Sequence, residues 1–578
     1  MLLKADARTL TAGTDVLTGE NGGTAGDDVF LAPDTALNQF DQIDGGAGVD
    51  TLRVGGDSTE IQGDISGVEV VRIEGDAVAS YNTTAVGGLE KLEFVGQQGS
   101  VVSVNGLTAG QTVAATNSNG GTNGSFFNLN LSVASGSTAN VALNNSVVNL
   151  SAASAVADGT IDTLNIESEG DSTLSLSGDP ASFTGDLRNV TANVAAEGTL
   201  TLDGSSIADG TTEEFVFDGS ASQGAIIDTA GVLQYATSVT TGAGDDGFIL
   251  SSDNETVNTG AGDDIVQIGM GTTLNEDAAI DLGEGYDAVR LVLDGTSASS
   301  ISADGYEQLN TIEGAEEVRV NLDGGIGSEF TVDMAELDAT TLGLDDGAIV
   351  TNLTSDDLVK SHVGTNSGYA DYQLQAARND DADAEFSDGG VVNFEATETS
   401  NPSVIAANTA AADGSDFDTL NLSGEGAITF DNTGGSAATI DASDLSGGLS
   451  FTAGDEAETV TLGEGEDTLN YSAGVSTYAS TDTITGFGEG DTIQLSGVDG
   501  GDGVSEYDAS GAASYEQALS SAAASDADGA WFEFSGSTYV VQNTDGASVT
   551  DEASTDTVIE LTGVDLGLTA DSFTAATV

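Results

Sequence analysis

The sequence has no cysteine and only one histidine among 578 residues. Without cysteine there is no disulfide framework, thiolate zinc site or cysteine nucleophile. A three-histidine zinc site cannot form, and a Ser-His-Asp triad would have to use His362, whose neighbours Ser361, Val363 and Gly364 do not form a nucleophile elbow. Paired carboxylates for glycoside hydrolysis stay open, but the single Trp531 lies far from the central segments. The sequence therefore predicts a protein that is not an enzyme.

Basic residues are also scarce, with 10 Lys and Arg against 96 Asp and Glu and a net charge of -86. Such a surface repels phosphate backbones and anionic headgroups, which argues against a nucleic-acid partner and against charge-driven binding to a bilayer. It attracts cations. An alternative that the composition leaves open is that the acidity only keeps a salt-adapted protein soluble.

Long apolar runs are absent as well. No stretch of 18 apolar residues occurs, and residues 1–8 lack the apolar core of a secretory signal, so we expect neither membrane insertion nor export through such a signal. Hydrophobic residues nevertheless make up 38% of the chain and glycine occupies 78 positions, too apolar for full disorder and too rich in glycine for a helical fold. The composition predicts an all-β protein with many turns.

What the sequence does contain is a nine-residue repeat of the form G-G-x-G-x-D-x-U-x, where U is a large apolar residue. The complete copy spans 45–53, and incomplete copies span 10–18, 23–31, 241–249, 259–267, 282–290 and 462–470. The candidate metal ligands at the acidic position are Asp15, Asp28, Asp50, Asp246, Glu255, Asp264, Asp287, Glu458 and Asp467. The candidate glycines of the turns are Gly45, Gly46, Gly48, Gly242, Gly244, Gly260, Gly262, Gly283, Gly285, Gly454, Gly463 and Gly465.

Some copies are in phase with one another. Asp246 and Asp264 are 18 residues apart, and Glu255 stands midway between them at the acidic position. Glu458 precedes Asp467 by nine residues in the same way. Phased repeats bring acidic side chains of successive turns together, whereas an isolated Gly-x-Gly-x-Asp is read equally well as an ordinary turn.

This repeat suits calcium, a hard cation that binds about 6 to 8 oxygen atoms. Glycine turns supply backbone carbonyls and one carboxylate per turn, while the x-U-x triplet is a short strand with its apolar residue inside. One repeat cannot bury its apolar face alone, so the stack is stable only collectively. The sequence predicts a parallel β-roll or β-solenoid that holds several calcium ions.

Between the phased blocks, segments that alternate apolar and polar residues predict further strands. The segments 67–73 and 88–94 are alike and start 21 residues apart, about one coil of a solenoid. A capping box at Ser514 to Gln517 predicts a short helix over the alanine-rich residues that follow. The expected organisation is a roll start at 1–60, a strand-rich segment at 61–235, a central block at 236–295, a β-rich segment at 296–450 with an inserted loop or small helix at 361–389, a second block at 451–500 and a C-terminal cap at 501–578.

The nonapeptides resemble those of the RTX proteins exported by type I secretion, and among them the RTX-type S-layer proteins of Gram-negative bacteria. Two further segments carry the resemblance: 439–454 is similar to strand-and-roll units of S-layer assembly domains, and 482–496 with 530–542 resembles the end of RTX proteins, where the secretion signal resides. The sequence departs from the family in having a nonapeptide-like copy already at Leu10, where the best-known S-layer members have a domain that anchors to lipopolysaccharide.

The resemblance implies export by the type I secretion machinery, calcium-triggered folding outside the cell, and self-association into a surface layer, with cell-surface polysaccharide as a further partner. We therefore expect an extracellular, calcium-binding structural protein that assembles into an S-layer, lattice or filament. The alternative is a soluble or adhesive secreted calcium-binding protein of the biofilm matrix that forms no ordered assembly.

Overall fold

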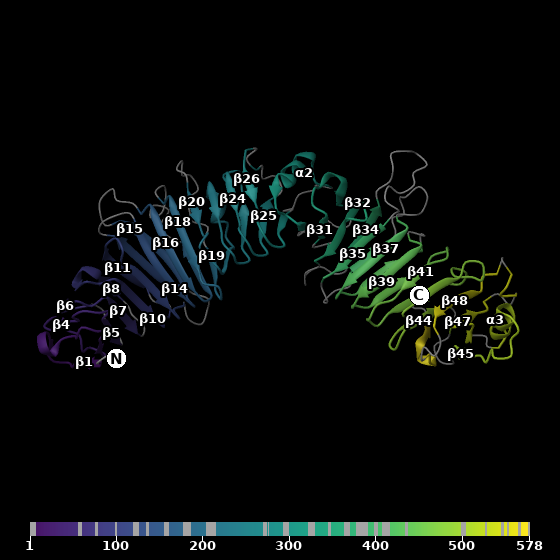
Figure 1. Cartoon of the computed structure of the whole chain (residues 1–578), viewed down its shortest axis with the longest axis horizontal. Helices are drawn as coiled ribbons and strands as arrows, with labels where there is room; N and C mark the ends of the chain where they lie inside the picture. The colour runs from purple at the N-terminus through teal and green to yellow at the C-terminus, as the bar shows by residue number, and fades with distance from the viewer. Residues whose placement is uncertain are drawn as a thin grey trace. The chain divides into compact units, whose positions relative to one another are not determined.

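The computed structural model describes residues 7–55, 61–74, 79–98, 101–119, 126–133, 138–154, 161–176, 187–203, 215–269, 274, 277–292, 300–321, 330–344, 348–362, 370–376, 391–397, 403–406, 417–433, 437–496, 498, 504–525, 529–544, 548–551, 554–563 and 568–575. They form two compact units, one of residues 1–289 with 311–315 and one of 290–310 with 316–578. Each unit is a parallel β-solenoid, which confirms the fold class expected from the sequence (Figure 1).

In the first unit the chain winds so that successive strands fall alternately on different sheets (Figure 1). The first sheet contains β1 (Ala7–Thr9), β3 (Val29–Ala32), β5 (Thr51–Gly55), β7 (Val70–Glu74), β10 (Lys91–Val95), β12 (Thr112–Thr116), β14 (Thr138–Asn144), β16 (Thr163–Glu169), β18 (Asn189–Val194), β20 (Val216–Asp218), β22 (Ser238–Thr240), β24 (Thr256–Asn258), β26 (Ala279–Asp281) and β28 (Ile312–Glu313). The second contains β8 (Ala79–Asn82), β11 (Val101–Leu107), β13 (Phe127–Val133), β15 (Val147–Ser154), β17 (Ser172–Leu176), β19 (Thr199–Asp203), β21 (Ala225–Asp228), β23 (Gly247–Leu250) and β25 (Ile265–Gly269). A small third sheet contains β2 (Val16–Leu17), β4 (Gln42–Asp44), β6 (Asp64–Ser66) and β9 (Val86–Gly87), and the division between the units falls within β27 (Ala288–Val292).

The second unit repeats this plan with two sheets. One contains β29 (Glu317–Asn321), β31 (Thr341–Leu344), β33 (Leu358–Ser361), β35 (Val391–Ala396), β37 (Thr419–Gly424), β39 (Thr439–Leu445), β41 (Thr459–Thr461) and β43 (Asp482–Thr485). The other contains β30 (Thr331–Asp333), β32 (Ile349–Leu353), β34 (Ala370–Ala376), β36 (Ser403–Ala406), β38 (Ile428–Asp431), β40 (Leu449–Thr452), β42 (Thr468–Tyr471), β44 (Thr492–Leu495) and β49 (Phe573–Ala575). Helix α2 (Ala303–Asn310) precedes them.

The register of the strands confirms the repeat. Phe248 of β23 lies opposite Val266 of β25, 18 residues on, so one coil there is two nonapeptides long. Phe451 and Leu469 are paired in the same way in the second unit. In six of the copies the apolar residue is buried, as expected: Phe30, Leu52, Phe248, Val266, Val289 and Leu469. In the copy 10–18, Leu17 is only partly buried. The 21-residue spacing of the segments 67–73 and 88–94 is also one coil, since Val71 pairs with Leu92.

A small module follows the last coils of the second unit. It contains β45 (Ser505–Glu506), α3 (Tyr515–Ala523), β46 (Ala530–Phe534), β47 (Ser537–Gln542) and β48 (Thr557–Thr562). Strands β46, β47 and β48 are antiparallel, and β48 also pairs with β43 of the solenoid. Helix α3 has Ser514 as its N-cap, with Gln517 N donating to the Ser514 hydroxyl, as the capping box predicted.

The segment 361–389 differs from the expected loop or small helix. Ser361 ends β33, and β34 (Ala370–Ala376) lies in the middle of the segment. Residues 370–372 of β34 pair with β36, and Gln373, Leu374 and Ala376 pair with β32. The acidic run at 379–383 lies outside the described residues. The remaining segment boundaries stay a prediction, since each compact unit contains several of the segments. No helix among the described residues is long and apolar enough to cross a membrane.

Candidate metal sites

Buried acidic residues stand immediately before the strands and are stacked from coil to coil. In the first unit Asp246, Asp264 and Asp287 precede β23, β25 and β27, and we call them the central row. The backbone N–H of Asp246 donates to Asp264 Oδ1 at 2.7 Å, and that of Asp264 donates to Asp287 Oδ1 at 2.8 Å. All three side chains are buried, so each carboxylate is fixed by the amide of the coil before it.

The second oxygen of Asp264 is buried and has no hydrogen-bond partner among the described residues. Burial, opposed by hydrogen bonds from Thr259 and Asp246, raises the pKa of Asp264 to about 7, and repulsion from Asp246 and Asp287 adds to the rise. Burial likewise raises the pKa of Asp246 to about 6. Without a cation, both carboxyl groups are therefore protonated at a higher pH than an exposed aspartate, because a buried charge is costly unless it is paired.

A similar N-terminal row contains Asp28, Asp50 and Glu69, which precede β3, β5 and β7. Asp28 N donates to Asp50 Oδ1 at 2.7 Å, and Asp50 N donates to Glu69 Oε2 at 2.8 Å. Asp50 Oδ2 is buried without a partner among the described residues, and burial together with the charges of Glu69 and Asp28 raises the pKa of Asp50.

Asp28 at the end of this row differs from Asp50. Arg8 Nη1 lies 3.0 Å from Asp28 Oδ1. Burial alone would raise the pKa of Asp28, but hydrogen bonds from Thr24 and from Arg8 outweigh it and lower the pKa. In the first coil, then, an arginine of the chain itself neutralises the buried carboxylate.

The second unit has two such pairs, one before each sheet. Asp467 N donates to Asp491 Oδ1 at 2.9 Å in front of β42 and β44. Glu458 N, in front of β41, donates at 3.0 Å to Oδ1 of Asp482, the first residue of β43. Asp467 Oδ2, Glu458 Oε2 and Asp482 Oδ2 are all buried without a partner among the described residues. Burial, with the charge of Asp491, raises the pKa of Asp467 to about 6. Burial raises the pKa values of both Glu458 and Asp482. Repulsion from Asp482 adds to the rise at Glu458, whereas hydrogen bonds with Glu458 oppose the rise at Asp482.

The repeat glycines let neighbouring coils approach each other beside these carboxylates. A Cβ at Gly45 would lie 1.7 Å from the Gly67 carbonyl oxygen and 2.7 Å from Asp50 Oδ2, so both oxygens face the same small space. At Gly260 a Cβ would likewise meet the Gly242 carbonyl oxygen, and the backbone φ is +99°, a value that residues with a side chain rarely adopt. A Cβ would meet backbone of an adjacent coil at all of the others: Gly46, Gly48, Gly242, Gly244, Gly262, Gly283, Gly285, Gly454, Gly463 and Gly465.

Two of the predicted ligands lie elsewhere. Glu255 is exposed and does not join the central row, because its nonapeptide falls on the opposite sheet from Asp246 and Asp264. Asp15 is only partly buried, and its N–H donates to Asp41 Oδ1 at 2.8 Å in front of the third sheet. The structure therefore brings together Asp28 with Asp50, and Asp246 with Asp264 and Asp287.

Several residues of the rows were not predicted: Glu69, Asp41, Asp482 and Asp491. Asp482 and Asp491 each precede a threonine and an isoleucine, a pattern that recurs along the chain and signals the turn before a strand. Glu69 has a comparable place in the segment 67–73. Asp41 lies in no recognisable repeat, so the sequence offers no signal for it.

These rows supply carboxylates in lines rather than in compact clusters. Among the described residues, no three acidic or histidine side chains converge on one point. A cation here would therefore take one or two carboxylates and complete its shell with backbone carbonyls and water, which suits a hard ion with many oxygen ligands.

The single histidine has a different environment. His362 Nε2 lies 2.7 Å from Glu317 Oε1, and Arg319 Nε donates to the same oxygen at 3.0 Å. Glu317 is fully buried; burial would raise its pKa, but the hydrogen bonds and charges of His362 and Arg319 lower the pKa to about 2. Glu317, Arg319 and His362 therefore form a cluster of ion pairs around a buried carboxylate in the second unit.

Comparison with models of protein families finds no match to this chain. Comparison with curated proteins finds no match either.

Proposed function

We propose that this protein is a secreted calcium-binding structural protein that folds on calcium binding and self-assembles into a surface layer or an extracellular lattice or filament. The observation that carries the calcium part is the set of buried carboxylate oxygens that have no partner among the described residues. They belong to Asp50, Asp264, Glu458, Asp467 and Asp482. Each would be costly to bury as a free charge, and each lies in a row that carries the repeat.

Calcium suits these sites better than other divalent ions. The donors are carboxylates and backbone carbonyls, whereas zinc favours sulfur and nitrogen ligands, and the chain has no cysteine. Magnesium requires near-ideal octahedral geometry and keeps its water, which a line of stacked coils does not match. Bound calcium would supply the positive charge that lets the rows stay ionised.

Folding would depend on the ion by linkage. The rows exist only when coils are stacked, so calcium binds the folded state and stabilises it over the unfolded chain. Circular dichroism in excess chelator and in millimolar calcium tests this, with millimolar magnesium as the matched divalent control. We expect β content to rise with calcium far more than with magnesium. Equal β content in chelator and in calcium at neutral pH would contradict the proposal.

Assembly is supported by the resemblance to S-layer proteins and by the charge. A surface of -86 cannot pack against its own copies by diffuse attraction, so contacts through shared ions or strand edges are required. Such contacts are local and resist salt. Light scattering should therefore show oligomers in millimolar calcium that persist in 1 M sodium chloride and disappear in chelator.

The soluble or adhesive alternative is favoured by one observation. The large hydrophobic side chains exposed among the described residues are scattered along the chain: Val16, Phe40, Val49, Val101, Ile265 and Tyr286. No broad apolar interface is evident from them. Particles that remain monomeric in calcium at high protein concentration would select this alternative and leave the calcium proposal standing.

A further inference from the structure

A groove crosses the outer face of the first sheet in the first unit, from β7 to β18. Its volume is about 640 Å³, within the range of ligand sites. Ala114 of β12 and Ala142 of β14 form its floor. They occupy equivalent positions on paired strands, where the outward side chains of the neighbouring strands β10 and β16 are Glu93 and Glu167. Two small residues in the middle of a row of long ones therefore create the hollow.

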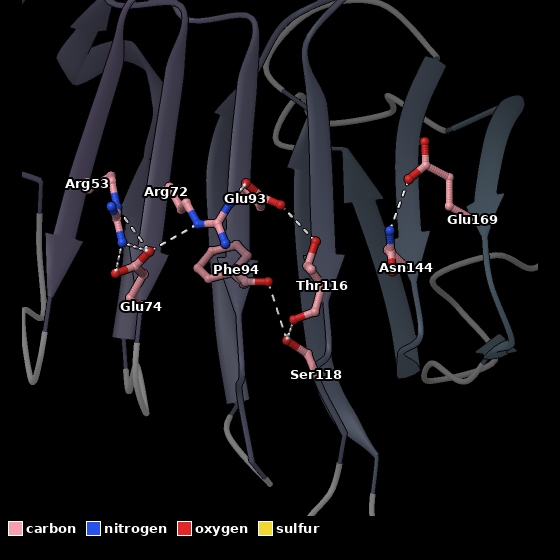
Figure 2. Close-up of polar contacts among 9 residues, drawn as sticks. All are labelled: Arg53, Arg72, Glu74, Glu93, Phe94, Thr116, Ser118, Asn144 and Glu169. Carbon is pink, nitrogen blue, oxygen red and sulfur yellow. Dashed lines mark hydrogen bonds and ion pairs between the residues drawn. The ribbon is translucent and has the colours of Figure 1, made fainter. Parts of the chain in front are cut away.

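The walls hold oriented polar groups (Figure 2). Thr116 Oγ1 donates to Glu93 Oε1 at 2.7 Å, and Asn144 Nδ2 donates to Glu169 Oε2 at 2.9 Å. Each of these groups keeps further capacity, since a carboxylate accepts several hydrogen bonds and an amide has two donors. The groove thus presents fixed donors and acceptors next to each other.

Two of the chain's few basic residues also line the groove. Arg72 is paired with Glu74 at 3.1 Å and with Glu93 at 3.3 Å (Figure 2). Lys91 is partly buried and has no hydrogen bond or ion pair among the described residues. The lining therefore contains donors and acceptors of both charges and is close to neutral, unlike the rest of this acidic chain.

This lining excludes several classes of ligand. Polyanions are repelled by the three carboxylates and by the net charge of -86. Glu93 and Glu167 lie three strand spacings apart, about 14 Å, so no single cation bridges the carboxylates of β10 and β16. An added peptide strand needs the edge of a sheet, whereas this groove lies on a face whose backbone groups are already paired.

We propose that this groove binds a neutral polysaccharide. Each hydroxyl of a sugar both donates and accepts, as the neighbouring carboxylates, amides and ammonium require. Of the two floor alanines, the partly buried Ala142 offers its methyl group to the C–H face of a sugar ring, whereas Ala114 is only 2% exposed and deepens the hollow. The groove runs across the strands, whose separation of about 4.8 Å is close to the length of one sugar unit, so successive sugars meet successive strands.

Binding at this groove is a separate activity from calcium binding and assembly, although it requires the folded solenoid. The decisive variant is Ala142→Phe, which fills the floor from a side chain that points outward and is only partly buried. Its matched control is Ala279→Phe, at an exposed outward position of β26 in the same sheet and outside the lining.

The test is affinity electrophoresis and a glycan array on the full chain in millimolar calcium, with neutral glucans, mannans and galactans as probes and alginate as the anionic comparison. We expect a neutral glycan to bind, Ala142→Phe to weaken that binding at least tenfold, and Ala279→Phe to change it less than twofold. Circular dichroism of each variant in calcium separates a lost site from a lost fold.

Four results would overturn the proposal. The first is that no neutral polysaccharide binds the folded protein, and the second is that alginate alone binds. The third is that Ala142→Phe binds the glycan as the parent does. The fourth is that Ala142→Phe abolishes self-association while no glycan binds, which would make a second copy of the chain the occupant.

Discussion

Protons should replace calcium in the rows, and Asp264 is the residue at which this is measured best. Its pKa is about 7, above the ordinary 3.8, because of burial and the neighbouring carboxylates. A raised carboxyl pKa contributes stability that is fully present below about pH 4 and is lost as the pH rises through about 7. In chelator the β content should therefore be higher at pH 5 than at pH 8, whereas in calcium it should be nearly independent of pH in this range.

The substitution Asp264→Asn keeps the oxygen that accepts from Asp246 N and removes the charge. The rise in pKa corresponds to about 4 kcal/mol as an upper limit, which screening by nearby solvent reduces to about 2 kcal/mol. In chelator at pH 8 the variant should be more stable than the parent by this amount. In calcium it should be less stable, because one ligand has lost its charge.

Urea unfolding followed by circular dichroism, in chelator and in calcium at both pH values, gives the four comparisons required. The matched control is Asp253→Asn, at an exposed acid in the same coil, which should leave the unfolding free energy unchanged both in chelator and in calcium. If Asp264→Asn destabilised the protein equally with and without calcium, the carboxylate would be only a structural hydrogen-bond acceptor, and the reasoning would be refuted.

The remaining predictions concern the glycine turns, the ion pairs of Glu317 and the C-terminal module. Gly465→Ala places a Cβ 2.3 Å from the Gly447 carbonyl oxygen and should lower the unfolding free energy by about 2–4 kcal/mol in urea titrations, whereas Gly511→Ala, with open space around it, should be near neutral. Because the pKa of Glu317 is lowered to about 2, its contribution is present above about pH 4.5 and lost as the pH falls toward 2; Glu317→Gln should remove about 2 kcal/mol at pH 7, and Glu307→Gln, at an exposed position of α2, should not. Removing the chain after Gly500 should abolish export to the medium, measured by immunoblotting of cells and medium, while calcium titration of the purified fragment still shows binding; a truncated protein in the medium would contradict export by a C-terminal signal.

The fold could be predicted from the sequence because the nine-residue spacing of the repeat determines how long a coil is and which residues face the core. A nine-residue unit with one buried apolar residue allows two units per coil, and the pairing of Phe248 with Val266 follows from that spacing. The helix α3 was also predictable, because a serine three residues before a glutamine satisfies the first free amides of a helix. In both cases the information lies within a few neighbouring residues.

The membership of the acidic rows was harder to predict because coil length varies. Asp264 and Asp287 are stacked although 23 residues separate them, and Asp467 and Asp491 although 24 do. A strict nonapeptide count instead favours Glu255, which falls on the opposite sheet and is exposed. Which acidic residues are stacked depends on the length of every loop between them, and the sequence alone does not show where each coil ends and the next begins.

The groove has no sequence signal for the same reason. Its floor residues Ala114 and Ala142 are 28 residues apart, and the flanking Glu93 and Glu167 share no motif with them. They meet because paired strands place equivalent positions side by side. Because the groove is formed by residues of different coils, it can be recognised only when the register between the strands is known.

The scarcity of basic residues links the composition to the proposed dependence on calcium. Arg8 shows that a buried carboxylate of a row can be neutralised by the chain itself. With only 10 Lys and Arg in 578 residues, this solution is not available to every row, and Asp50, Asp264 and Asp467 each keep a buried oxygen without a partner among the described residues. A lysine or arginine at each row would make folding independent of the surroundings. Under the proposed function, leaving them out would make the folded state conditional on cations from outside, and the same acidic composition would then favour folding where calcium is plentiful.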